Sequence, residues 1–283
     1  MNIVVYFEIT RKKKRMLKYI VWPIIFSVIL FAVCMAVDGI FPNFNNNYMK
    51  WPDMLKDLLC LRSWTSHLWL NVWQFFMLAY PFYLIYNIMK EQAQAISEEE
   101  RLETIVYLHN AGVSRRELFA AKWFVWMGEM VLCCLSLAVV NVVSAAILRY
   151  TQGIWNALKY YGILFLVCML YLVIALFAAA CKGKKDMSGD TIVAILIIPL
   201  LVSRIPAFLR FFSALLVLTG REGAIVDKIS QIGTQTEILT AVSPLTWCWP
   251  DMQITAVHII FGVVVYIVML TAGFSIYTHR RQY

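Results

Sequence analysis

Two serines in a charged stretch of the chain each precede a glutamate by three residues. Ser97 precedes Glu100, and Ser114 precedes Glu117. At this spacing the serine hydroxyl can accept a hydrogen bond from a backbone N–H of the first helical turn, and the glutamate can bond back to the serine N–H. The pattern therefore predicts one helix start at each serine, with Gly112 as the left-handed residue that ends the first of the two helices.

The helix expected over residues 97–113 is amphipathic. Its apolar face carries Leu102, Ile105, Leu108 and His109, and its charged side carries Glu99, Arg101, Glu103 and Tyr107. Charged side chains that project from a short helix suit the binding of a soluble partner rather than catalysis. The alternative interpretation is an ordinary loop helix that rests on a membrane surface.

Motifs for bond-making chemistry are absent from the sequence. The segment 182–185 lacks the spacing of a phosphate-binding loop, and no Gly-x-Ser-x-Gly or Gly-x-Gly-Asp occurs. A Glu-Glu-x-x-x-Arg protease signature would need arginine at position 103, which is glutamate. The four histidines and seven cysteines follow no metal-ligand spacing. We therefore expect no catalytic residues, cofactor or metal in this chain; a disulfide between Cys60 and Cys248 stays open.

Composition indicates that a lipid bilayer surrounds these elements. Hydrophobic residues make up 61% of the 283 residues, charged residues 15%, and the mean hydropathy is +0.69. Crossing about 30 Å of hydrocarbon takes about 20 apolar residues in a helix. Runs of this kind predict an all-α integral membrane protein with six transmembrane helices, near residues 19–37, 68–89, 123–148, 161–180, 191–218 and 254–277.

Basic residues predict the orientation, because cytoplasmic loops are enriched in Lys and Arg. They gather before the first run, in the second and fourth loops and in the C-terminal tail, so both termini should be cytoplasmic. This asymmetry accounts for most of the net charge of +8 without a nucleic-acid surface. Residues 1–18 are expected to form an interfacial helix against membrane lipid, and residues 219–253 an outer segment that is re-entrant or lies on the surface.

Two ionisable residues fall within the apolar runs and are candidates for a translocation path. Burying a charge in hydrocarbon is costly, so such residues are often functional. Glu129 is expected near the inner face, within reach of Lys90 or Lys122, and Arg204 nearer the outer face. Pro199 and Pro206 flank Arg204 and predict a broken helix there. For both residues, a purely structural contact is the competing interpretation.

The charged stretch also resembles a known family. The run Glu100–Thr104, then Leu108, the segment 111–117 and Lys122 are similar to the first cytoplasmic loop of type-2 ABC exporter permeases. That loop carries a Glu-Arg-Glu run, a Gly-Thr pair, two leucines, a Val-Ser-Arg turn and a lysine. This chain departs from it at Glu103, where the family has glycine. The six spans, the N-terminal helix and the inside termini extend the likeness over nearly the whole chain.

The resemblance implies that residues 97–113 form a cytoplasmic coupling helix, between the second and third spans, in a bacterial cell membrane. The residues expected to dock on a separate ATP-binding subunit are Glu99, Glu100, Arg101, Glu103, Thr104, Leu108, Arg115 and Arg116. ATP and Mg would be held by that subunit, and a second permease chain, identical or a close paralogue, would complete the pathway. The implied cargo is amphipathic or hydrophobic, such as a small peptide toxin or bacteriocin.

Other functions remain open at this point. The cargo could instead be a lipid, a drug or an ion. Outside the exporter class, the alternatives are a non-catalytic membrane scaffold or sensor, a secondary transporter and an intramembrane protease.

Overall fold

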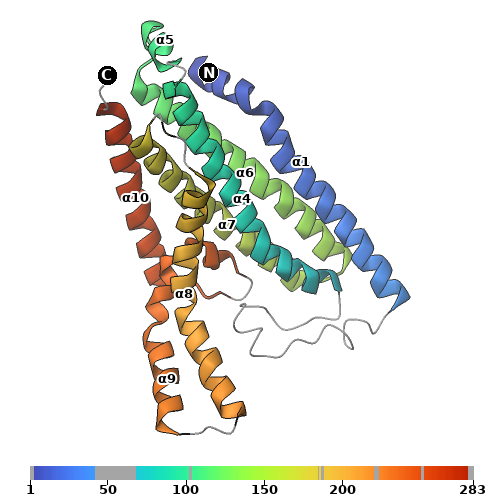
Figure 1. The fold of residues 1–283 in the computed structure, drawn as a ribbon. Coiled ribbons are helices and arrows are strands. Elements are labelled where there is room, and N and C mark those ends of the chain that lie inside the picture. The colour runs from blue at the N-terminus through green and yellow to red at the C-terminus, as the bar shows by residue number, and fades with distance from the viewer. Residues whose placement is uncertain are drawn as a thin grey trace. The chain divides into compact units, whose positions relative to one another are not determined.

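The structure is a computed structural model that describes residues 3–41, 68–101, 104–183, 185, 188–219, 223–249 and 252–279. Within these residues it is helical throughout, with no strand (Figure 1). Along the chain the helices are α1 (Ile3–Ile40), α4 (Leu68–Arg101), α5 (Thr104–Asn110), α6 (Arg115–Ile147), α7 (Thr151–Lys182), α8 (Gly189–Leu218), α9 (Ala224–Gln235), η1 (Glu237–Val242), η2 (Pro244–Cys248) and α10 (Ala256–His279).

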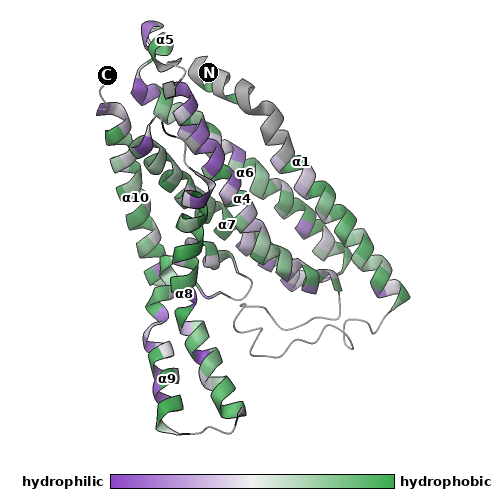
Figure 2. Cartoon of the chain, viewed as in Figure 1, coloured by the Kyte–Doolittle hydropathy of each residue, from purple (hydrophilic) through white to green (hydrophobic). Residues whose placement is uncertain are grey.

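Six of these helices are long and apolar enough to cross a membrane, which confirms the six predicted runs. The candidate spans are Tyr19–Ile40, Leu68–Glu99, Arg115–Ile147, Thr151–Lys182, Gly189–Leu218 and Ala256–His279. Hydrophobic residues run along most of each one, and polar residues gather at the end of α4 next to α5 (Figure 2). A helix satisfies its own backbone hydrogen bonds, so it is stable in hydrocarbon that offers no other partner. The chain is thus a multi-pass membrane protein by length and composition of its helices.

The described chain divides into two compact units. Unit 1 takes residues 1–28, 83–193 and 263–283, and unit 2 takes residues 29–82 and 194–262. The helices α1, α4, α8 and α10 each contribute to both units.

Unit 1 is built around the antiparallel pair α6 and α7. Between the two helices Asn141 Nδ2 donates to Tyr161 Oη at 2.7 Å, a contact inside the apolar spans. The turn that joins them puts Arg149 at φ 53°, the one non-glycine residue with positive φ in the described chain. Tyr150 N–H donates to Ala145 C=O and Arg149 N–H to Ala146 C=O, so this residue occupies the left-handed cap position usually held by glycine.

The helix α10 approaches α7 closely in unit 1. A Cβ added at Gly273 would lie 3.1 Å from Phe177 Cα, so the contact leaves no room for a side chain. Small residues of this kind let membrane helices approach within van der Waals contact where no hydrophobic force drives them together. Nearby, Phe119 of α6 meets Phe274 and Tyr277 of α10, with each pair of ring centroids 5.6 Å apart.

Unit 2 contains a helical hairpin and a ladder of aromatic rings. In the hairpin, Gly233 of α9 lies against α8, where an added Cβ would be 3.3 Å from the carbonyl oxygen of Pro206. The ladder begins at Phe31 of α1 and continues along one side of α4 through Trp69, Trp73, Phe76 and Tyr80, with successive centroids 4.2–5.3 Å apart. Stacking at this spacing adds to the apolar burial of the rings.

Three predicted boundaries differ from the structure. Residues 3–18 are helical, but α1 continues through them to Ile40 without ending at residue 18. The expected helix start at Ser97 is wrong, because Ser97 lies inside α4 and its hydroxyl donates to the carbonyl of Gln94. The expected break around Arg204 is also wrong, since α8 is continuous through Pro199 and Pro206. Residues 223–249 form α9, η1 and η2, and their position relative to the membrane stays a prediction.

The close approach at Gly273 generates a first prediction. Gly273→Leu should separate α10 from α7 and lower the thermal unfolding midpoint in detergent, because overpacking a tight contact costs about 1–3 kcal/mol. Gly162→Leu, on α7 with open space around its Cβ position, is the matched control. Equal midpoints for the two variants would show that the α7–α10 approach does not stabilise unit 1.

Candidate functional site: the α5 loop

The segment 99–117, here called the α5 loop, joins the end of α4 to the start of α6 in unit 1. Polar residues gather at this end of the unit (Figure 2). The C-terminal end of α5 is closed by its own backbone. Val113 N–H donates to Leu108 C=O and Gly112 N–H to His109 C=O, both at 2.9 Å. Gly112 has φ +82°, as expected from its type. This pair of bonds satisfies carbonyls that a helix end otherwise leaves unpaired.

The start of α6 is closed by the predicted capping box. Ser114 Oγ accepts a hydrogen bond from Glu117 N–H at 3.2 Å, and Glu117 Oε2 accepts one from Ser114 N–H at 2.9 Å. The sequence prediction at Ser114 and Glu117 is therefore confirmed. Replacing a serine cap by alanine costs about 0.5–2 kcal/mol, so this box is a substantial local constraint on where the loop ends.

A buried ion pair joins the two helices beneath the loop. Lys122 Nζ of α6 lies 2.6 Å from Glu99 Oε1 of α4, and the two side chains are 0% and 3% exposed. An ammonium and a carboxylate this far from water are stable only when they neutralise each other at close range. Glu99, expected as a docking residue, is thus a buried residue that holds α4 against α6.

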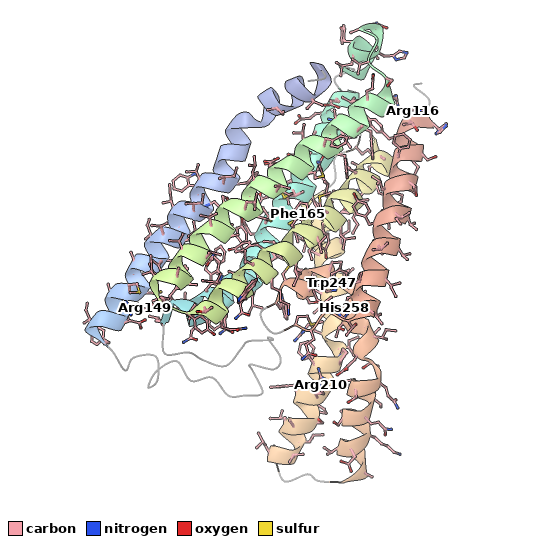
Figure 3. The ribbon with its side chains drawn as sticks, turned by 180° about the vertical axis from the view of Figure 1, so that it is seen from behind. Arg116, Arg149, Phe165, Arg210, Trp247 and His258 are labelled. Carbon is pink, nitrogen blue, oxygen red and sulfur yellow. The ribbon has the colours of Figure 1, made fainter. Side chains whose placement is uncertain are left out.

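The two arginines at the start of α6 have different environments. Arg115 Nη1 donates to Tyr277 C=O at 3.2 Å, and its guanidinium lies 5.9 Å from the centre of the Tyr277 ring. It therefore ties the loop to the end of α10. Arg116 is exposed, at the opposite end of α6 from Arg149 (Figure 3). Of these two predicted docking residues, Arg116 is available to a partner, and Arg115 is engaged within the unit.

The exposed side of α5 combines apolar and polar groups. Tyr107 is 74% exposed and Val106 39% exposed, although both are large hydrophobic residues. His109 and Asn110 are exposed beside them, and Leu108 is half-buried. The helix α5 is thus closed at its C-terminal end and presents an aromatic ring to solvent, and exposed Tyr is a residue type enriched in protein-binding surfaces.

Several predicted site residues lie outside what the structure describes. Glu100 and Arg101 end α4 and Thr104 begins α5, but their side chains are not described, and Glu103 lies entirely outside the described residues. The same holds for Cys60 and hence for a disulfide with Cys248.

The two candidates for a translocation path belong to different units. Glu129 is 1% exposed, two helical turns beyond Lys122 in unit 1. Arg204, 6% exposed, belongs to unit 2, where its guanidinium stacks over the ring of Trp249 with 4.5 Å to the centroid. This cation–π contact links α8 to the segment after η2, which favours a structural role for Arg204. Sequence spacing alone did not reveal this partner, since it lies 45 positions further along the chain.

The described residues hold no group of three metal-ligating side chains. Comparison of the chain with family models, with curated proteins and with solved structures gave no match. The function is therefore inferred from the geometry of the loop and from the sequence.

The buried ion pair generates a second prediction. Lys122→Met should destabilise the protein by about 3–5 kcal/mol, because the Glu99 carboxylate loses the ammonium that neutralises it in a dry site. Combining it with Glu99→Leu should restore most of that loss. Unfolding in detergent, followed by tryptophan fluorescence, measures both. Lys182→Met, which removes a contact with Thr191 Oγ1 at 3.4 Å, is the control. An equal loss of stability in Lys182→Met would show that the buried ion pair of Lys122 is not the cause of the effect.

The Arg204–Trp249 stack generates a third. In a double-mutant cycle with Arg204→Leu and Trp249→Leu, the coupling free energy should be about 0.5–2 kcal/mol in favour of the pair. The exposed ion pair of Arg210 and Glu237, 2.6 Å apart, should give a smaller coupling free energy, about 0–1 kcal/mol. If the coupling for Arg204 and Trp249 is absent, the stack does not contribute to the stability of unit 2.

Proposed function

We propose that this chain is the membrane permease subunit of a type-2 ABC exporter, in which the α5 loop docks on a separate ATP-binding subunit. The observation that carries the proposal is the construction of this loop. A short helix with an exposed Tyr107 is held by local caps at Gly112 and Ser114, and a buried ion pair braces the helices beneath it. Stiff support is what a contact needs if it is to pass movement from a soluble partner to membrane helices.

The sequence supports the same proposal through what it lacks. It has no phosphate-binding loop, so ATP and Mg would be bound by the partner chain. Basic residues are concentrated in the α5 loop, the fourth loop and both termini, and the positive-inside rule then predicts that these segments lie in the cytoplasm. The protein itself would then be no enzyme: it would convert the conformational cycle of the ATPase into movement of the spans.

Six spans form half of the pathway usual for such exporters, so we propose that two permease chains, identical or paralogous, assemble with two ATP-binding chains in the cell membrane. The cargo class we favour is amphipathic or hydrophobic, including small peptides such as toxins or bacteriocins.

The decisive experiment is purification of the chain with an ATP-binding subunit encoded beside it. Light scattering should give the mass of two permease and two ATPase chains, and ATPase activity should change when the permease is present. A stable particle with a single permease chain would contradict the proposed assembly. A permease that never retains the ATPase would favour the scaffold or sensor alternative.

The docking surface gives the fourth prediction. Tyr107→Ala should weaken retention of the ATPase by about thirtyfold or more, since an exposed aromatic anchor buried on binding is worth about 2 kcal/mol or more. Arg116→Glu should weaken it less, by about 1 kcal/mol for a rim charge, and more strongly at low salt. Binding is measured by biolayer interferometry on nanodisc-embedded permease.

The matched control is Tyr83→Ala, because Tyr83 is an exposed tyrosine, 48% exposed, in the middle of α4. It should leave both membrane insertion and ATPase retention unchanged. Unaltered retention in Tyr107→Ala and Arg116→Glu together would indicate that the α5 loop rests on lipid and binds no protein.

A further inference from the structure

A buried histidine stands where α10 begins, in unit 2. His258 is 4% exposed, and Thr255 immediately precedes the helix. The backbone N–H of Thr255 donates to His258 Nδ1 at 3.2 Å, and the Thr255 hydroxyl lies 2.7 Å from the same nitrogen. This bond is one half of a capping box, in which histidine takes the place of the usual glutamate or glutamine.

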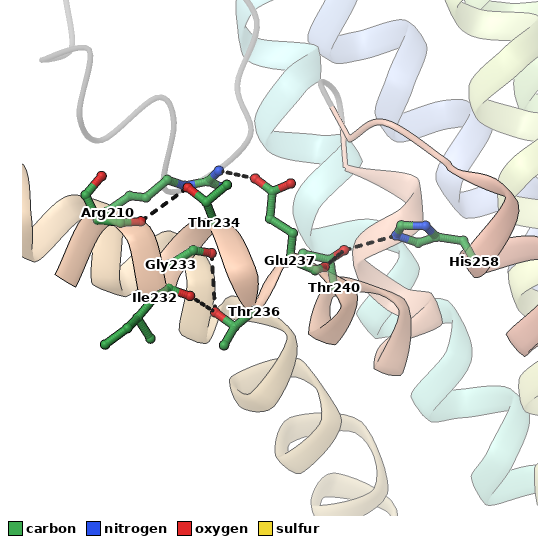
Figure 4. A network of polar contacts seen from close by, with 9 residues as sticks. Arg210, Ile232, Gly233, Thr234, Thr236, Glu237, Thr240 and His258 are labelled. Carbon is green, nitrogen blue, oxygen red and sulfur yellow. Dashed lines mark hydrogen bonds and ion pairs between the residues drawn. The ribbon is translucent and has the colours of Figure 1, made fainter. Parts of the chain in front are cut away.

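The same ring reaches a second element. His258 Nε2 lies 3.2 Å from Thr240 Oγ1 of η1, and the Thr240 hydroxyl donates to Glu237 C=O at 2.6 Å (Figure 4). The edge of the ring also faces Trp247 of η2, with 5.6 Å between centroids. One imidazole therefore fastens η1, η2 and the first turn of α10 to each other.

These contacts fix the tautomer of the imidazole. A backbone N–H can only donate, so Nδ1 must be the acceptor and carries no hydrogen. The Thr240 hydroxyl already gives its hydrogen to Glu237, so its oxygen accepts from Nε2–H. Each partner is satisfied when the ring is neutral and protonated on Nε2. A proton added to Nδ1 would face the Thr255 N–H and remove the acceptor from the cap.

No charged side chain of the described elements packed against the ring contacts it. On η1, the Glu237 carboxylate pairs with Arg210 of α8 at 2.6 Å, where both groups are half-exposed (Figure 4). On η2, the facing residue is Trp247, and Thr255 precedes α10. Arg204 of α8 is directed to Trp249. An imidazolium formed here would have no anion within these contacts to stabilise it.

We infer that His258 is a pH-sensitive latch: while neutral it holds η1 and η2 against the start of α10, and when protonated it releases them. The closed arrangement binds no proton on Nδ1 and the released one does, so by linkage the latch is closed above the ordinary titration range of histidine and opens as the pH falls below it. Acidification of the compartment that this end of the protein faces would loosen residues 237–262 while the rest of unit 2 stays folded. The inference does not depend on the proposed exporter function.

Hydrogen exchange of the intact protein in nanodiscs tests the latch. After correction for the intrinsic pH dependence of exchange, protection of the amides in 237–242 and 256–260 should fall about tenfold between pH 7.5 and pH 5.5, the loss expected for one helix cap. His258→Gln keeps an acceptor for the Thr255 N–H but cannot be protonated, so its protection should be high and independent of pH.

His279→Gln is the control, because His279 is an exposed histidine in the last turn of the same helix. It should retain the full pH response of the unmodified chain. Thr240→Val should loosen residues 237–242 at both pH values and leave the cap of α10 intact. If His258→Gln shows the same fall in protection as the unmodified chain, or if the unmodified chain shows none, the latch does not exist.

Discussion

The arrangement of unit 1 depends on a charge pair that has been removed from water. Glu99 and Lys122 meet at 2.6 Å with almost no exposed surface. Desolvating two such charges costs several kcal/mol each, and their close contact offsets much of that cost. Apolar packing tolerates small slips between helices, whereas an ion pair in a dry site does not. This contact therefore fixes how far the end of α4 lies along α6, and with it the two ends of the α5 loop.

The elements of unit 2 are held together by different kinds of contact. Many of its contacts between elements involve rings: the aromatic ladder on α4, Arg204 over Trp249, and His258 against Trp247. The α9 hairpin adds a backbone contact at Gly233, where no side chain intervenes. Such contacts are broad and weakly directional, except at His258, where hydrogen bonds select one tautomer.

Sequence reasoning predicted the features whose causes are local. The six spans follow from run length, and the cap at Ser114 follows from a glutamate three residues away. The same cap pattern failed at Ser97, because the residues before it, rich in Gln, Ala, Glu and Lys, favour helix and carry α4 straight through. A serine inside a helix then bonds back to a carbonyl of the preceding turn. The same Ser-x-x-Glu spacing therefore begins a helix at Ser114 but not at Ser97, because the residues before Ser97 have a high helix propensity.

The interaction partners of the buried charges could not be predicted from local sequence. Glu99 finds Lys122 23 positions later, and Trp249 finds Arg204 across a helical hairpin. In each case the residue type indicated that a partner was needed, since a buried charge must be neutralised or stacked. Which residue would supply it depends on how helices pack, and periodicity within one helix does not contain that information. The expectation of a broken helix at Arg204 failed for a related reason: prolines in membrane helices are tolerated without ending them.

The two caps around α5 also bear on how this protein can evolve. The bonds that fold the loop use backbone groups, Gly112, Ser114 and Glu117, while Val106, Tyr107, His109 and Asn110 are left outside them. The bonds that stabilise this short segment and the side chains that it exposes therefore lie at separate positions. Substitutions at the exposed positions would therefore cost little stability, because these side chains make none of the bonds that hold the loop. A lineage that duplicated this chain could acquire a new interaction by altering a few side chains.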